Sequence, residues 1–88
     1  PPADVLELLR VLLKCQCERH NVAPKLIASA ADLEAIALDD DADVPALSGW
    51  RRKVYGELAL KLKRGEIALR LPKARVEIVE TAEASEPA

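Results

Sequence analysis

The sequence predicts an all-α domain, a small bundle of about four to five helices. Fifteen alanines and fourteen leucines, against three glycines, favour helix over strand. Apolar residues recur at helical spacing through most of the chain, and residues typical of helix ends separate the runs. With 88 residues the chain is one domain, and a domain of this size buries only about 60–65% of its unfolded surface.

The first helix is predicted from about Asp4 to Arg19. Asp4 is a suitable N-cap, and Asn21 tolerates the left-handed conformation that ends many helices. We expect its buried face to contain Val5, Leu8, Leu9, Leu12 and Cys15, widened by Leu6 and Leu13.

Two shorter helices are predicted next. One begins at Pro24, which suits a first helical position, and would bury Leu26 and Ile27. The other follows a capping box formed by Ser29 and Asp32 and runs to about Leu38. Its buried residues are expected to be Leu33, Ile36 and Ala37.

The fourth helix is predicted from about Gly49 to Arg64, with Ser48 as N-cap and Gly65 after its last turn. Trp50 is expected to be its structural anchor and to open an apolar stripe. That stripe continues through Val54, Leu58 and Leu62, with Tyr55 and Ala59 beside it. A buried Trp50 predicts that Trp50→Ala costs roughly 3–5 kcal/mol.

Residues 67–79 leave two interpretations open. Apolar residues alternate at Ile67, Leu69 and Leu71 and again at Val76 and Ile78, which is typical of a β-hairpin. The first of these runs is also compatible with a prolonged helical region. We assign residues 1–80 to the helical domain and residues 81–88 to a disordered acidic tail. The abrupt start and this tail suggest the C-terminal end of a longer protein.

Charge is distributed unevenly along the chain. Residues 1–50 hold four Lys/Arg and nine Asp/Glu, whereas residues 51–75 hold nine Lys/Arg and two Asp/Glu. This asymmetry indicates either an anionic partner or mutual neutralisation of the two halves within the fold. The candidate phosphate-binding residues are Arg51, Arg52, Lys53, Lys61, Lys63, Arg64, Lys73 and Arg75.

Other site classes find little support. The loop from Asp39 to Asp43 lacks the glycine and glutamate spacing of an EF-hand. One histidine and two cysteines are too few for a closed zinc site. Nothing marks a catalytic serine, a phosphate-binding glycine loop, a secretory signal or a membrane span. No metal, cofactor or membrane partner is therefore expected, and the unpaired cysteines fit the cytoplasm.

One stretch resembles a known family. Leu47-Ser48-Gly49-Trp50-Arg51-Arg52, followed by Tyr55-Gly56-Glu57 and Leu62-Lys63-Arg64-Gly65-Glu66, is similar to the C-terminal domain of bacterial ribonuclease D. Residues 22–29 and 32–37 fit the same pattern. The resemblance covers roughly residues 3–70, and the following region looks like an alphaproteobacterial variant.

The resemblance implies a helicase-and-RNase-D C-terminal (HRDC) type of helical domain. Ribonuclease D is a 3′–5′ exoribonuclease of RNA and tRNA processing, with two divalent metals in an N-terminal nuclease domain that is absent here. No catalytic residue carries over to this chain. The expected partners are RNA, bound through its phosphates, and the nuclease domain of the same protein. The alternative is a structural module that docks on the nuclease core, or on a second HRDC-like domain, without binding RNA.

Overall fold

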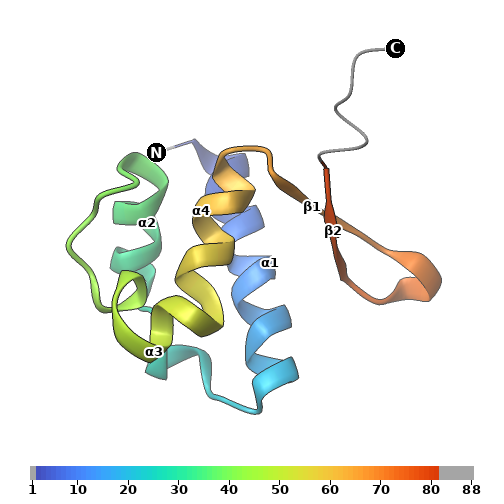
Figure 1. The fold of residues 1–88 in the computed structure, drawn as a ribbon, viewed down its shortest axis with the longest axis horizontal. Coiled ribbons are helices and arrows are strands. Elements are labelled where there is room, and N and C mark those ends of the chain that lie inside the picture. The colour runs from blue at the N-terminus through green and yellow to red at the C-terminus, as the bar shows by residue number, and fades with distance from the viewer. Residues whose placement is uncertain (1, 82–88) are drawn as a thin grey trace.

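The computed structural model describes residues 2–81 as three main helices followed by a β-hairpin (Figure 1). The elements are α1 (Ala3–His20), α2 (Ala30–Leu38), a long composite helix, β1 (Ile67–Arg70) and β2 (Glu77–Glu80). The composite helix joins α3 (Gly49–Arg51), a π-helical segment (Arg52–Gly56) and α4 (Glu57–Lys63) without a break. The prediction of four to five helices was too high, because residues 24–26 form only one 3₁₀ turn.

Helix α1 packs through a face shifted from the predicted one. Its buried residues are Leu9, Leu12, Leu13, Gln16 and Cys17. The predicted burial of Leu8 is wrong, because its side chain is 47% exposed. The predicted burial of Cys15 is also wrong, because Cys17 is the buried cysteine and Cys15 is only half-buried. The true face includes a polar residue, Gln16, which a purely apolar pattern passes over. Asp4 lies inside the first turn rather than at the N-cap, which is Pro2.

The connection between α1 and α2 follows the predicted end signals more closely. Asn21 adopts φ 55° and closes α1 with its backbone N–H on the carbonyl of Cys17. Ser29 and Asp32 form the predicted capping box, each side chain accepting from the other residue's backbone N–H. Ile27 is buried as expected, but Leu26 is 53% exposed because the 3₁₀ turn directs it outward.

The composite helix lies very close to the 3₁₀ turn Pro45–Leu47 that precedes it. A Cβ on Gly56 would stand 2.2 Å from the carbonyl oxygen of Ala46, so only glycine permits this contact. Ser48 does occupy the N-cap position, but its hydroxyl donates to the carbonyl of Pro45 instead of capping the helix. At the other end Gly65, with φ +76°, follows the last turn as predicted.

The prediction that Trp50 is a buried structural anchor is wrong, because its side chain is 47% exposed. The backbone N–H of Glu57 bonds to the carbonyl of Arg52, five residues earlier, so the π-helical segment holds one residue more than an α-turn. The extra residue rotates the helix before it relative to the helix after it. The α-helical spacing that links Trp50 to Val54 therefore no longer places both side chains on the same face. The buried aromatic residue is Tyr55, which is 0% exposed.

Two buried hydrogen bonds join the π-helical segment to α1. The Tyr55 hydroxyl donates to the carbonyl of Leu9 at 2.9 Å. In return, the side-chain amide of Gln16 donates to the carbonyl of Val54 at 2.7 Å. Each element thus supplies one side-chain donor and one backbone acceptor, which fixes both the separation and the register of the two helices.

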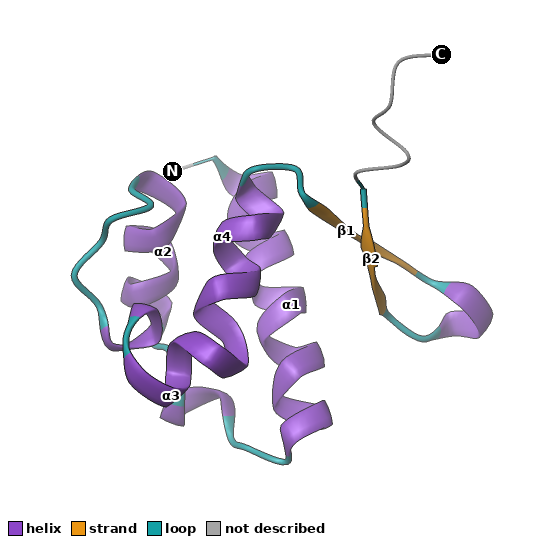
Figure 2. Ribbon diagram, in the orientation of Figure 1, coloured by secondary structure: helices purple, strands orange, loops and turns teal. Residues whose placement is uncertain are grey.

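The chain ends in a hairpin, which settles the ambiguity of residues 67–79 (Figure 2). Strands β1 and β2 pair antiparallel, with Leu69 opposite Ile78. Ile67 is buried, and Leu69 and Ile78 pack on the helical core, which gives this short hairpin the support it needs. Thr81 bonds through its backbone N–H to Glu66. The rest of the predicted tail, residues 82–88, lies outside the described residues.

We predict that Tyr55→Ala destabilises the chain by about 3–5 kcal/mol, because it removes a fully buried aromatic ring. Tyr55→Phe should cost about 1 kcal/mol, because it removes only the hydrogen bond to Leu9. Trp50→Ala should cost clearly less than Tyr55→Ala. Urea unfolding monitored by circular dichroism measures all three, and a larger loss at Trp50 than at Tyr55 would contradict this packing.

Candidate nucleic-acid interface

Four of the eight predicted phosphate-binding residues already have partners within the fold. Arg52 pairs with Glu57 at 2.9 Å, Lys63 with Asp40 at 2.5 Å and Arg64 with Glu66 at 3.4 Å. Arg52 also donates to the carbonyl of Leu47. The fourth, Arg51, donates to the carbonyl of Leu26 at 2.7 Å.

Lys63 has a structural role that its sequence position does not reveal. Its ammonium group donates to the carbonyl of Ile36, near the end of α2, and its side chain is only 15% exposed. The hydrogen bond from Lys63 holds the pKa of the Asp40 carboxyl below its ordinary value of 3.8. Lys63 therefore joins the end of α4 to the end of α2 and to the acidic loop after it.

The other four predicted cations are available to a ligand. Within residues 2–81, Lys53, Lys61, Lys73 and Arg75 form no ion pair. Lys53, Lys73 and Arg75 are exposed, and Lys61 is half-buried. Lys73 and Arg75 lie in the hairpin loop, so the fold separates them from the cations of the composite helix.

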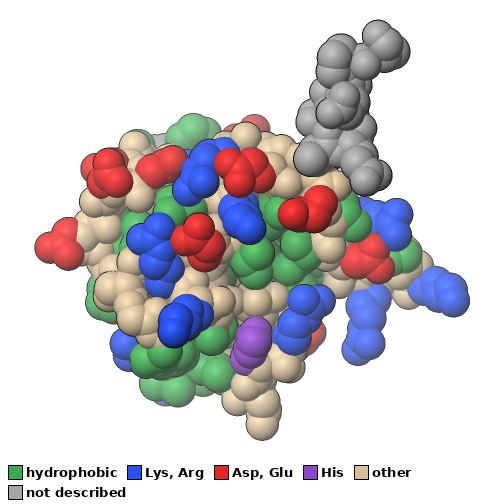
Figure 3. All heavy atoms as spheres, viewed as in Figure 1, with side chains coloured by type: hydrophobic (Ala, Val, Ile, Leu, Met, Phe, Trp, Pro, Cys, Tyr) green, Lys and Arg blue, Asp and Glu red, His purple; other side chains and the backbone are tan. Residues whose placement is uncertain are grey.

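A groove of about 580 Å³ lies between α1 and the hairpin loop. Lys14, Arg19 and Arg75 line it together with Glu18, on walls formed by Val11, Cys15, Ala74 and Val76. Figure 3 shows Lys and Arg side chains gathered around the hairpin on this side of the molecule. The groove thus presents an excess of positive charge over an apolar floor.

Sequence reasoning missed Lys14 and Arg19. They lie in the acidic half of the chain, and more than fifty residues separate them from Arg75. Only the hairpin, which folds back toward α1, brings the three cations to one groove. Helical spacing puts Lys14 and Glu18 on one face of α1, but no local pattern identifies the element that covers that face.

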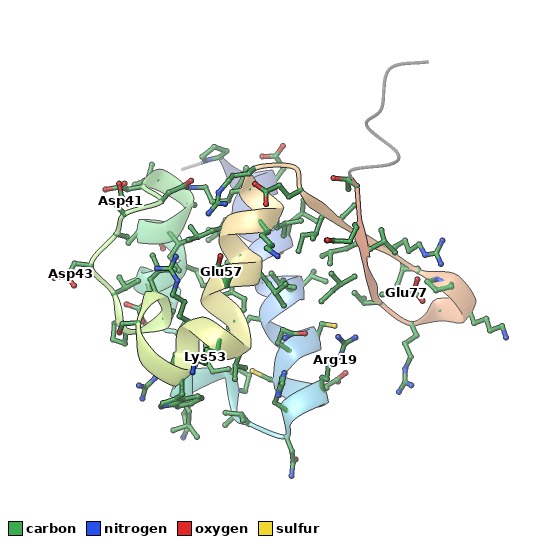
Figure 4. The ribbon with its side chains drawn as sticks, in the orientation of Figure 1. Arg19, Asp41, Asp43, Lys53, Glu57 and Glu77 are labelled. Atoms are coloured by element: carbon green, nitrogen blue, oxygen red, sulfur yellow. The ribbon has the colours of Figure 1, made fainter. Side chains whose placement is uncertain are left out.

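The acidic loop lies on the opposite side of the helical body. Figure 4 shows Asp41 and Asp43 beside α2, whereas Arg19 points from the last turns of α1 toward the hairpin. Asp39 accepts a hydrogen bond from the backbone N–H of Asp41, and Asp40 binds Lys63. The acidic loop is therefore neutralised in part where α4 meets it, and within residues 2–81 the groove cations form no ion pair.

No group of three or more His, Cys, Asp or Glu side chains in residues 2–81 is arranged to hold a metal ion. Burial raises the pKa of the Cys17 thiol, so this cysteine stays protonated as a core residue. None of the described helices has both the length and the apolar character needed to cross a membrane.

Comparison with known proteins supports the resemblance to ribonuclease D that the stretch around Gly49-Trp50-Arg51 indicated. The chain is 58% identical over 78 residues to a ribonuclease D from Nitrobacter hamburgensis, 48% over 81 residues to one from Granulibacter bethesdensis and 47% over 76 residues to one from Gluconacetobacter diazotrophicus. These matches cover 89%, 92% and 86% of this chain. The resemblance to ribonuclease D is confirmed.

The chain spans only about a fifth of these ribonuclease D relatives, 19–20% of the length of each. Most of a ribonuclease D thus lies outside the matched region. No family model matches the chain, and no solved structure matches it. The similarity therefore connects this small helical domain to ribonuclease D by sequence.

We predict that Lys63→Ala destabilises the chain by about 1–3 kcal/mol, because it leaves the Ile36 carbonyl and the Asp40 carboxylate without their donor. Lys61→Ala removes the same charge from the same helix without removing an ion pair, and should stay within about 0.5 kcal/mol of the parent. Thermal unfolding of both variants measures the difference, and equal losses would contradict the structural role of Lys63.

The same contact predicts a pH dependence. Because Lys63 lowers the pKa of Asp40 in the folded state, the contact stabilises fully above the unfolded value of 3.8. Its contribution is lost as the pH falls through the lower folded value. The stability difference between the parent and Asp40→Asn should therefore be constant at neutral pH and shrink toward zero in acid. A difference that grows in acid would contradict this assignment.

Proposed function

We propose that this chain is an accessory RNA-binding domain of HRDC type in a ribonuclease D-like 3′–5′ exoribonuclease. In this proposal the domain positions RNA, including tRNA precursors, for a nuclease domain elsewhere in the same protein. The divalent metals and the carboxylates that hold them belong to that nuclease domain. The chain itself performs no chemical step.

The groove between α1 and the hairpin is the observation that carries the proposal. Its three cations, Lys14, Arg19 and Arg75, form no ion pair within residues 2–81, and Lys73 extends the positive charge along the loop. Cations that a fold leaves unpaired on one side are the usual means of binding a phosphate backbone. The confirmed resemblance to ribonuclease D makes RNA the relevant polyanion.

A structural module is the second candidate. Leu8 and Val11 are exposed on α1 at 47% and 37%, and their spacing places them on one helix face. An exposed apolar face of this kind suits packing against another domain. In this case the groove cations would pair with carboxylates of the nuclease core instead of phosphates.

We predict that Arg19→Glu and Arg75→Glu each weaken binding of a structured, tRNA-like RNA several-fold, and that each reduces the salt dependence of the affinity. Each reversal removes about one phosphate contact, so the slope of log K against log salt should fall by about one unit. Fluorescence anisotropy of labelled RNA at low and moderate salt measures both quantities.

Arg64→Glu is the matched control, because it makes the same change of charge at an arginine whose partner, Glu66, lies outside the groove. It should leave the RNA affinity nearly unchanged. If the parent binds no RNA at low salt but associates with a separately produced nuclease domain, the structural module is the correct function. If Arg64→Glu weakens binding as much as Arg19→Glu, the groove is not the site.

A further inference from the structure

The tryptophan that sequence periodicity placed in the core lies on the surface. The side chain of Trp50 is 47% exposed, at the start of the composite helix, and Trp50 is the only tryptophan of the chain. Leaving so large an apolar side chain in water gains nothing from the hydrophobic effect. A single exposed apolar side chain is common on protein surfaces, so the surroundings of Trp50 decide whether it meets a ligand.

The surroundings of Trp50 are held in place by the fold. The guanidinium carbon of Arg51 lies 4.6 Å from the centroid of the Trp50 ring, within the range of a cation–π contact. Arg51 in turn donates to the carbonyl of Leu26, which anchors it to the 3₁₀ turn after α1. The guanidinium of Arg51 thus covers one face of the ring and holds it, which leaves the opposite face for the proposed ligand.

The charge around this ring is positive. Lys25 precedes Leu26, and Lys53 follows Trp50 at helical spacing; both are exposed and neither forms an ion pair within residues 2–81. The nearby acid on the composite helix, Glu57, is occupied by Arg52. A ligand of this surface must therefore combine a flat apolar part with negative charge.

We propose that Trp50 is a stacking platform for an unpaired nucleobase of the bound RNA, with Arg51 holding the ring in place and Lys53 and Lys25 facing the adjacent phosphates. Aromatic and arginine side chains are the usual partners of splayed-out bases, and every base offers a face for stacking. The inference rests on the proposed function and adds a second contact, to single-stranded RNA, outside the groove.

The geometry links this platform to the groove. The Gln16 side chain binds the carbonyl of Val54, so the second half of α1 lies directly beside the residues that follow Trp50. Arg19 extends from that same half of α1, and Figure 4 shows Arg19 and Lys53 toward the same end of the molecule. In the proposal, one RNA strand meets both the groove cations and the Trp50 ring.

A protein partner fits this surface less well. Arg51 lies over the Trp50 ring and donates to the backbone carbonyl of Leu26, whose side chain is also exposed. The exposed neighbours in sequence, Lys25 and Lys53, are both cationic. A stable protein interface buries about 800 Å² on each side, and its centre is depleted of charge. Two exposed apolar side chains beside these cations match a nucleotide better than a protein surface in size and charge.

The test is a fluorescence titration with two oligonucleotides of equal length, one of adenosines and one without bases. Trp50 is the only tryptophan in the chain, so its emission reports on the platform alone. The adenosine strand should quench Trp50, whereas the abasic strand should bind through its phosphates without quenching. The affinities of the Trp50 variants, which lack this emission, are measured instead by fluorescence anisotropy of end-labelled strands. Trp50→Ala should weaken binding of the adenosine strand by roughly 5- to 100-fold and binding of the abasic strand by much less.

Trp50→Phe keeps an aromatic ring, and Trp50→Leu keeps only an apolar surface. If bases stack on this ring, Trp50→Phe should retain most of the affinity for the adenosine strand and Trp50→Leu should lose it. Two results would refute the platform without affecting the proposed RNA binding in the groove. One is that Trp50→Leu binds the adenosine strand as tightly as the parent; the other is that both strands bind the parent equally without quenching. If neither strand binds the parent at low salt, the proposed function fails and the platform fails with it.

Discussion

The reciprocal pair of buried hydrogen bonds between α1 and the π-helical segment is the contact on which the other features depend. Tyr55 donates to Leu9 and Gln16 donates to Val54, so each helix supplies a donor that the other must satisfy. A register shift along α1 would leave buried polar groups unpaired, at a cost of about 1–3 kcal/mol each. Burial also raises the pKa of the Tyr55 phenol, which stays a neutral donor.

This pair of hydrogen bonds determines which charged side chains remain without a partner within residues 2–81. It holds the composite helix so that Lys63 reaches the end of α2 and Arg51 reaches the turn after α1, and both become part of the fold. It also leaves the outer face of α1 open to the hairpin, where Arg75 joins Lys14 and Arg19. The charge asymmetry of the sequence therefore has two outcomes: neutralisation at the acidic loop and an unpaired groove beside the hairpin.

Local chemistry made much of the fold predictable. Asn21, the Ser29–Asp32 capping box and Gly65 all act where the sequence placed them, because each satisfies helix ends within a few residues. The failures have two causes. The position of Trp50 depends on a π-helical segment that ordinary helical periodicity does not anticipate, and the burial of Gln16 depends on a carbonyl 38 residues later. The groove residues Lys14 and Arg19 could not be assigned without the position of the hairpin.

The central claim is that the unpaired groove cations, not the charged residues at the end of α4, receive RNA. Mapping amide chemical shifts of the chain against a tRNA-like RNA, at low and moderate salt, tests it most directly. The account predicts shifts concentrated on the second half of α1, the hairpin loop and the start of the composite helix, all fading as salt rises. Shifts concentrated on residues 61–66 and the acidic loop, or none at low salt, would contradict it.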